Sequence, residues 1–204
     1  KGTDFNGEAT AYIDDFEGTQ GSIDLLSPLS WSLSSRPKEL PNTIPGTDAN
    51  GIDNGYGRAF LNWYTIDPIF YSNQRPDGIT DDDVSDLYTR RVFIEEIFPQ
   101  VDIVQGQTSV INTLDLSYYP TERGPYNFDP LAENGAPLDP NDSWAGITRQ
   151  ITSTDFEQAN VEYIEFWVQD PFLDNPSSTG GKLFVNLGNI SEDVLKDGNK
   201  QYEN

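Results

Sequence analysis

The chain has 204 residues, enough for one domain that buries most of the surface its unfolded form exposes. It contains no Cys and no His, which excludes disulfides, thiolate nucleophiles, Cys/His metal sites and a histidine general base within the chain. The net charge of −22, from 34 acidic and 12 basic residues, disfavours binding to nucleic acid and to anionic lipid.

The composition also indicates a folded piece of a larger protein. Aromatic residues make up 12% of the chain, whereas disordered segments are poor in them. The chain begins Lys1-Gly2-Thr3-Asp4, without the basic and apolar regions of a signal peptide, and contains no Met. No run approaches the roughly 20 apolar residues that a membrane-spanning helix needs. We therefore expect an internal segment of a longer chain, without a membrane span of its own.

Short runs rich in β-branched and aromatic residues, separated by Gly, Pro, Asn and Asp, predict strands. In the first half of the chain these runs are 9–16, 31–35 and 58–66, with a long loop over 37–57. Thr80 followed by three Asp residues predicts a helix start, because Thr caps free backbone NH groups and acidic residues suit the positive end of the helix dipole. Helical spacing of apolar residues continues over 83–92.

The second half is predicted to hold four more strands. Residues 110–119 alternate between two faces up to Pro120, and a loop over 121–142 separates them from a strand over 144–151. A short turn over 154–159 precedes 161–169, whose two apolar faces predict a buried central strand. The last strand is expected over 181–187, followed by a polar tail over 189–201.

These elements predict a mainly β fold. Seven or so short strands with long loops favour a jelly-roll-like β-sandwich with one short helix, and the order of motifs is similar to that of galactose-binding-like modules. We expect a single domain over residues 1–204, with a loop and helix insertion at about 66–108.

Longer stretches carry a more specific resemblance. They read YIDDFEGT at 12–19 with WSL at 31–33, YYPTERGPYNF at 118–128, SW at 143–144 with ITRQ at 147–150, TDFEQANVEYIEFWV at 154–168, GKL at 181–183 and LGNISEDV at 187–194. Together they resemble the SprA/Sov family, the giant outer-membrane translocons of the bacterial type IX secretion system.

This resemblance implies a place in protein transport. Members of the family are outer-membrane barrels of Bacteroidetes with a lateral gate, and they export folded proteins for secretion, surface attachment and gliding motility. Their partners include a smaller outer-membrane shuttle barrel, a plug protein and the secreted cargo. We accordingly expect a non-catalytic structural and interaction domain that contacts the rest of the barrel. It would lie outside the lipid, since the lipid-facing strand pattern of a barrel is missing, and the resemblance favours the extracellular side.

Several acidic clusters are candidate metal sites. Asp14, Asp15 and Glu17 could contribute to a calcium site, but neighbouring strand residues point in alternate directions, so a strand end is the preferred interpretation. Asp81, Asp82, Asp83 and Asp86 lack the spacing of a calcium-binding loop and are interpreted as a solvated helix start. Glu95 and Glu96 are interpreted as strand residues. No metal, cofactor or catalytic residue is assigned.

Aromatic residues and one corner are the remaining candidates for binding. Trp144 and Trp167 are predicted to lie in the core, whereas Trp63-Tyr64 is the better candidate for a sugar-stacking platform. The corner at 122–126 is interpreted as a turn, with a contact surface as the alternative, and Glu122 and Arg123 could each find an ion-pair partner there.

Two other functions stay open from the sequence. One is a carbohydrate-binding jelly-roll module of a secreted or cell-surface enzyme, with or without calcium. The other is a fragment of a glycosidase that uses two carboxylates, for which the sequence offers no identifiable pair.

Overall fold

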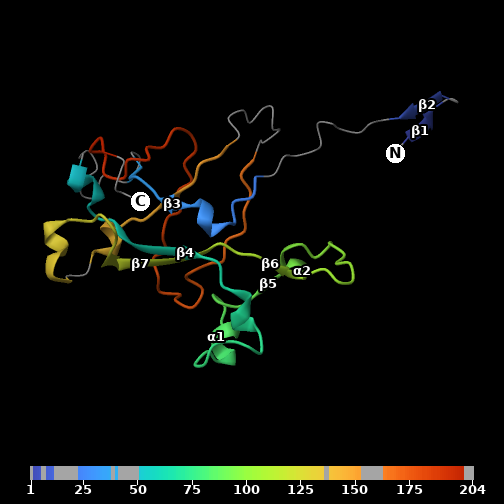
Figure 1. The fold of residues 1–204 in the computed structure, drawn as a ribbon, viewed down its shortest axis with the longest axis horizontal. Coiled ribbons are helices and arrows are strands. Elements are labelled where there is room, and N and C mark those ends of the chain that lie inside the picture. The colour runs from blue at the N-terminus through green and yellow to red at the C-terminus, as the bar shows by residue number, and fades with distance from the viewer. Residues whose placement is uncertain are drawn as a thin grey trace. The chain divides into compact units, whose positions relative to one another are not determined.

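The computed structural model describes residues 2–5, 8–11, 23–37, 40, 51–135, 138–152 and 163–199. The chain divides into two compact units, and Figure 1 labels β1 to β7, α1 and α2. The small unit comprises Lys1–Leu25 and Gln150–Gln169, and the large unit comprises Leu26–Arg149 and Asp170–Asn204. The single domain over 1–204 stays a prediction.

The small unit contains one described pair of strands. β1 (Gly2–Phe5) lies antiparallel to β2 (Glu8–Ala11). The strand predicted over 9–16 is confirmed for 9–11. Residues 12–16 lie outside the described residues, as does the turn predicted over 154–159.

The described strands of the large unit form antiparallel pairs. They are β3 (Ser32–Leu33) with β8 (Ile147–Thr148), β4 (Ala59–Tyr64) with β7 (Asp115–Arg123), and β5 (Val92–Phe93) with β6 (Val110–Ile111). The described chain is thus mostly non-helical with small antiparallel sheets, which is compatible with a small β-rich domain.

The helices are short and follow local sequence signals. They are η1 (Pro28–Ser30), η2 (Gly51–Gly55), η3 (Pro68–Tyr71), α1 (Asp81–Ser85), α2 (Ile94–Ile97), η4 (Pro130–Gly135) and η5 (Pro140–Asp142). Several begin with Pro, whose constrained φ and missing NH group suit the first helical position. Before η3, the side chain of Asp67 accepts a hydrogen bond from the backbone NH of Ile69 at 2.8 Å. In the described part of the chain, no helix has the length and apolar character to cross a bilayer.

Residues 65–114 leave the β4–β7 pair and return to it. η3, α1, β5, α2 and β6 all lie in this excursion, whose ribbon runs from teal to yellow-green in Figure 1. The insertion predicted at about 66–108 falls within it. The excursion therefore joins two strands that pair directly with each other.

Two predicted strands are wrong for the residues described. Residues 163–169 and 181–187 form no strand, and Trp167, predicted to lie in the core, exposes 65% of its surface. A central strand requires a hydrogen-bonded neighbour on each side, and apolar content alone supplies neither. Both segments instead present apolar side chains outward.

Other boundaries differ because strands change partner. The continuous strand predicted over 110–119 is two strands, β6 paired with β5 and β7 paired with β4. Pro120, predicted to end the strand, lies inside β7, where the register shifts between Ala59 and Phe60. A missing NH group is tolerated at such an irregularity. The strands predicted over 31–35 and 144–151 shorten to Ser32–Leu33 and Ile147–Thr148. The strand predicted over 58–66 is confirmed for Ala59–Tyr64, which form β4.

The helix predicted over 83–92 is a single short helix, α1, that begins as expected after Thr80 and ends at Ser85. Glu95 and Glu96, interpreted as strand residues, lie in α2 instead.

Among the described apolar residues, the buried ones are Ala59, Ala132, Trp144, Val194 and Leu195. The segment predicted as a polar tail thus contributes Val194 and Leu195 to the core of the large unit.

Candidate interaction site

Two apolar segments expose runs of large side chains in the described part of the chain. In the small unit, Tyr163 exposes 79% of its surface, and Trp167 and Val168 each expose 65%. In the large unit, Leu183 and Leu187 are similarly exposed. Neither segment pairs with any strand in the described part of the chain. Runs of exposed large apolar side chains of this kind mark surfaces that contact other proteins.

The β4–β7 pair carries aromatic side chains on both of its faces. On one face, the ring of Phe60 lies 5.7 Å from that of Tyr119, and the hydroxyl groups of Tyr64 and Ser117 lie 2.8 Å apart. Tyr64 and Tyr119 remain partly exposed. This face is therefore held together by side-chain pairs across the strands while it stays accessible.

Trp63, one of the two residues of the predicted sugar-stacking platform at Trp63-Tyr64, lies on the opposite face of the pair. Consecutive residues of a strand point to opposite sides, so Trp63 and Tyr64 do not form one flat surface. The indole NH of Trp63 donates to the backbone oxygen of Pro28 at 3.2 Å, which ties the half-buried ring to η1. Trp63 and Tyr64 therefore cannot form one sugar-stacking platform on this strand.

Trp144, predicted to lie in the core, is confirmed there, and it packs against two buried arginines. The guanidinium carbons of Arg58 and Arg36 lie 4.3 and 5.7 Å from its ring centroid. Arg58 also donates to the backbone oxygen of Ser34 at 2.8 Å, and the Trp144 indole NH donates to that of Tyr56 at 3.0 Å. This cluster joins β3 to the start of β4, and its burial makes it a packing element. No sequence signal separates these two arginines from exposed ones.

The corner at 122–126 is a structural turn, as predicted. A Cβ atom on Gly124 would lie 2.2 Å from the backbone oxygen of Ala59, so only glycine fits there. Tyr126 adopts a positive φ of 56°. Neither Glu122 nor Arg123 forms an ion pair with a described residue. Arg123 lies over the ring of Phe128 instead, at 5.9 Å.

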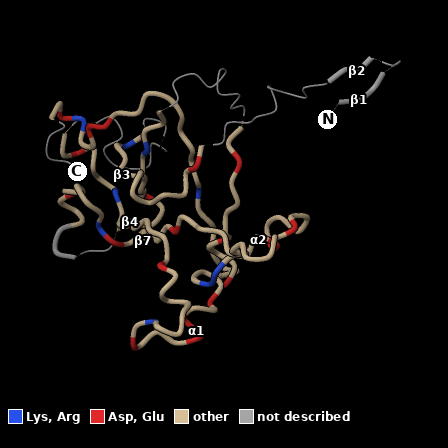
Figure 2. The backbone as a smooth tube through the Cα atoms, turned by 45° about the vertical axis from the view of Figure 1, so that its right-hand side comes forward, with Lys and Arg blue, Asp and Glu red and all other residues tan. Residues whose placement is uncertain are grey.

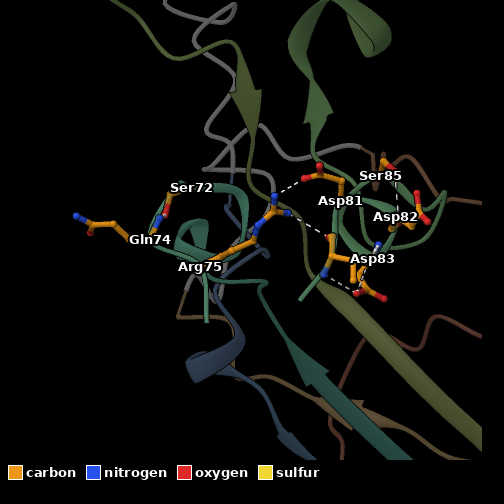
Figure 3. A network of polar contacts seen from close by, with 8 residues as sticks. Ser72, Gln74, Arg75, Asp81, Asp82, Asp83 and Ser85 are labelled. Atoms are coloured by element: carbon orange, nitrogen blue, oxygen red, sulfur yellow. Dashed lines mark hydrogen bonds and ion pairs between the residues drawn. The ribbon is translucent and has the colours of Figure 1, made fainter. Parts of the chain in front are cut away.

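The start of α1 is stabilised by a reciprocal cap. The Asp83 carboxylate accepts from the backbone NH and the hydroxyl of Thr80, at 2.8 and 2.7 Å, and the Thr80 hydroxyl accepts from the Asp83 NH. These bonds lower the pKa of Asp83. Figure 3 shows Arg75 beside this cap, pointing toward Asp81, with which it forms an ion pair. The solvated helix start predicted for the acidic residues is confirmed.

Residues of η3, α1 and β5, with the arginines before β5, line a hollow of about 260 Å³. Its lining residues are Tyr71, Val84, Ser85, Arg90, Arg91 and Phe93. Arg91 lies 5.3 Å from the ring centroid of Tyr71 and 5.9 Å from that of Phe93. Lys and Arg are sparse along the backbone, where acidic positions prevail (Figure 2). Two of the chain's 12 basic residues thus line this hollow.

Arg90 is fully engaged beside the hollow. Its two terminal nitrogens donate to the two carboxylate oxygens of Glu96 at 2.9 and 2.8 Å. This paired geometry lowers the pKa of Glu96 and raises that of Arg90. The interaction fastens α2 to the segment before β5, a role that the sequence did not reveal.

No group of three or more acidic residues in the described part of the chain is placed to hold a metal ion. Asp14, Asp15 and Glu17 lie outside the described residues, so their interpretation as a strand end stays a prediction. No protein-family model and no curated protein matches the chain.

Proposed function

We propose that the chain is a non-catalytic structural and interaction domain of a giant outer-membrane β-barrel translocon of the type IX secretion system, which supports protein secretion and gliding motility. The observation that carries the interaction role is the exposure of the apolar segments around Trp167 and Leu183. Apolar surface left in water costs about 25 cal/mol per Å² relative to burial, which favours a partner that covers it.

The assignment to this class of translocon rests on the sequence stretches between residues 12 and 194 that resemble the family. The acidic surface accords with a domain outside the lipid, because anionic headgroups would repel it. We place the domain on the extracellular side of the outer membrane. The partners under this proposal are the remainder of the barrel, the shuttle barrel, the plug protein and secreted cargo.

The finer fold belongs to the same proposal. Residues 163–168 and 183–187 have the apolar composition of strands but no ladder partner among the described residues. A jelly-roll-like sandwich would form if such segments paired within the complete protein, since each added ladder satisfies backbone groups and buries one face.

An immunoblot of fractionated source cells, with an antibody raised against this chain, tests the proposal. The expected result is a band of very high mass in the outer membrane and none in the soluble fraction. A secreted or periplasmic band of modest mass would overturn the proposal that the chain belongs to a translocon. A carbohydrate-binding module would then be the alternative, and an oligosaccharide array would test it.

A further inference from the structure

We infer that the hollow lined by Tyr71, Val84, Arg91 and Phe93 binds a peptide segment in which a carboxylate side chain adjoins an aromatic or aliphatic one. The inference rests on the proposed role as an interaction domain, but not on the type of assembly to which the domain belongs. Arg91 would hold the carboxylate, and the neighbouring rings and Val84 would contact the apolar group.

The positive charge at this hollow is available to a ligand. Arg91 is exposed and forms no ion pair with any described residue. Its guanidinium group lies near two aromatic rings, an arrangement that holds the planar group in place and leaves its edge to donate hydrogen bonds. A carboxylate is the group whose two oxygens match that edge.

Two carboxylates near Arg91 in the sequence already have other donors. Glu96 is held by Arg90 and by the backbone NH of Phe93, and Asp83 is held by Thr80. Asp115 influences the pKa of Tyr71, yet its carboxylate accepts from the Thr113 hydroxyl and makes no ion pair among the described residues. Arg91 is therefore not neutralised by these neighbours.

The size and lining of the hollow select the kind of ligand. A volume of about 260 Å³ is below the roughly 300–1,000 Å³ of sites that enclose a whole small molecule. It suits one or two side chains of a peptide, which is the scale of a single anchoring contact in a protein interface. The strong net negative charge elsewhere would repel an extensively acidic partner, so the acidic group should be isolated and flanked by an apolar one.

Binding of short peptides to the full chain tests the inference. The probes are Ac-Gly-Glu-Phe-Gly-NH2 and two matched peptides, with Gln in place of Glu or Ala in place of Phe. We expect the first peptide to shift the backbone amide NMR signals of Ser85, Arg91 and Phe93, and to bind about tenfold more tightly than either matched peptide. Equal affinity for the three peptides, or no shift at millimolar concentration, would overturn the inference.

Variants of two arginines make the test specific. Arg91→Gln should weaken binding about tenfold, and Arg91→Lys should restore part of the affinity. Arg123→Gln is the matched control, because Arg123 is also exposed and lies over an aromatic ring, that of Phe128, outside the hollow. It should change affinity less than about twofold. Equal losses in Arg91→Gln and Arg123→Gln would show a general charge effect and contradict the inference.

The outcome is independent of the immunoblot. Absence of peptide binding with a barrel-sized outer-membrane band would overturn this inference alone. Specific peptide binding together with a secreted band in the immunoblot would overturn only the proposal that the chain belongs to a translocon.

Discussion

The guanidinium carbon of Arg58 lies 4.3 Å from the ring centroid of Trp144, and the two residues also pair through their backbones. The NH of Ala59 donates to the oxygen of Trp144 at 2.8 Å, and the NH of Trp144 donates to that of Gly57 at 3.0 Å. Both side chains are buried. The large unit is therefore organised around a stacked cation and ring, which is less apolar than an ordinary core.

Truncation of Trp144 should destabilise the chain far more than truncation of Trp167. Trp144→Ala should lower the free energy of unfolding by about 3–5 kcal/mol, because it leaves a cavity beside two buried arginines. Trp167→Ala removes an exposed ring and should change it by less than about 0.5 kcal/mol. Urea unfolding followed by circular dichroism measures both. A large loss in Trp167→Ala would show that its ring is packed.

The local features of this fold could be predicted from the sequence, whereas the pairings could not. The cap at Thr80 involves groups three residues apart, and β4 follows from the aromatic run around Trp63. By contrast, 163–169 has the composition of a central strand, but a ladder depends on a partner distant in the chain. The burial of Arg58 likewise depends on Trp144, 86 positions away, and no local pattern marks it.

The close approach at Gly124 predicts a specific sensitivity. Gly124→Ala would drive a Cβ atom into the backbone oxygen of Ala59 and should cost about 2–3 kcal/mol or more in the free energy of unfolding. Gly78→Ala is the matched control, because Gly78 has a positive φ of 93° but open space around it. Its cost should be about 1 kcal/mol. Thermal unfolding of both variants decides the point, and equal losses would contradict the close contact.

The cap of α1 should be visible in a titration. Hydrogen bonds from Thr80 lower the pKa of Asp83, so the cap is fully present above the ordinary pKa of Asp83 and is lost as the pH falls through the lowered value. Thr80→Ala should raise the pKa of Asp83 toward its ordinary value, and Thr80→Ser should preserve the lowered one. NMR titration of the carboxyl carbon measures this. An unchanged pKa in Thr80→Ala would exclude the side-chain cap.

Asp115 should oppose folding at neutral pH. Its pKa is raised mainly by partial burial, so the folded state favours the protonated form and stability falls as the pH rises through the window between the ordinary and the raised pKa. Asp115→Asn keeps an acceptor for Thr113 and should stabilise the chain by less than about 1 kcal/mol, since the group is half exposed. The gain should grow across that window and then level off. A gain that is constant with pH would contradict this origin.

Hydroxyl-radical footprinting of Trp167 tests the central claim most directly, by comparing the isolated chain with the intact outer-membrane assembly. The side chain is exposed in the structure, so it should oxidise readily in the isolated chain. If the domain docks through its apolar segments, oxidation in the assembly should fall severalfold at Trp167 and remain unchanged at Leu29, which lies outside them and is 96% exposed. Equal oxidation of Trp167 in both samples would contradict docking through this surface.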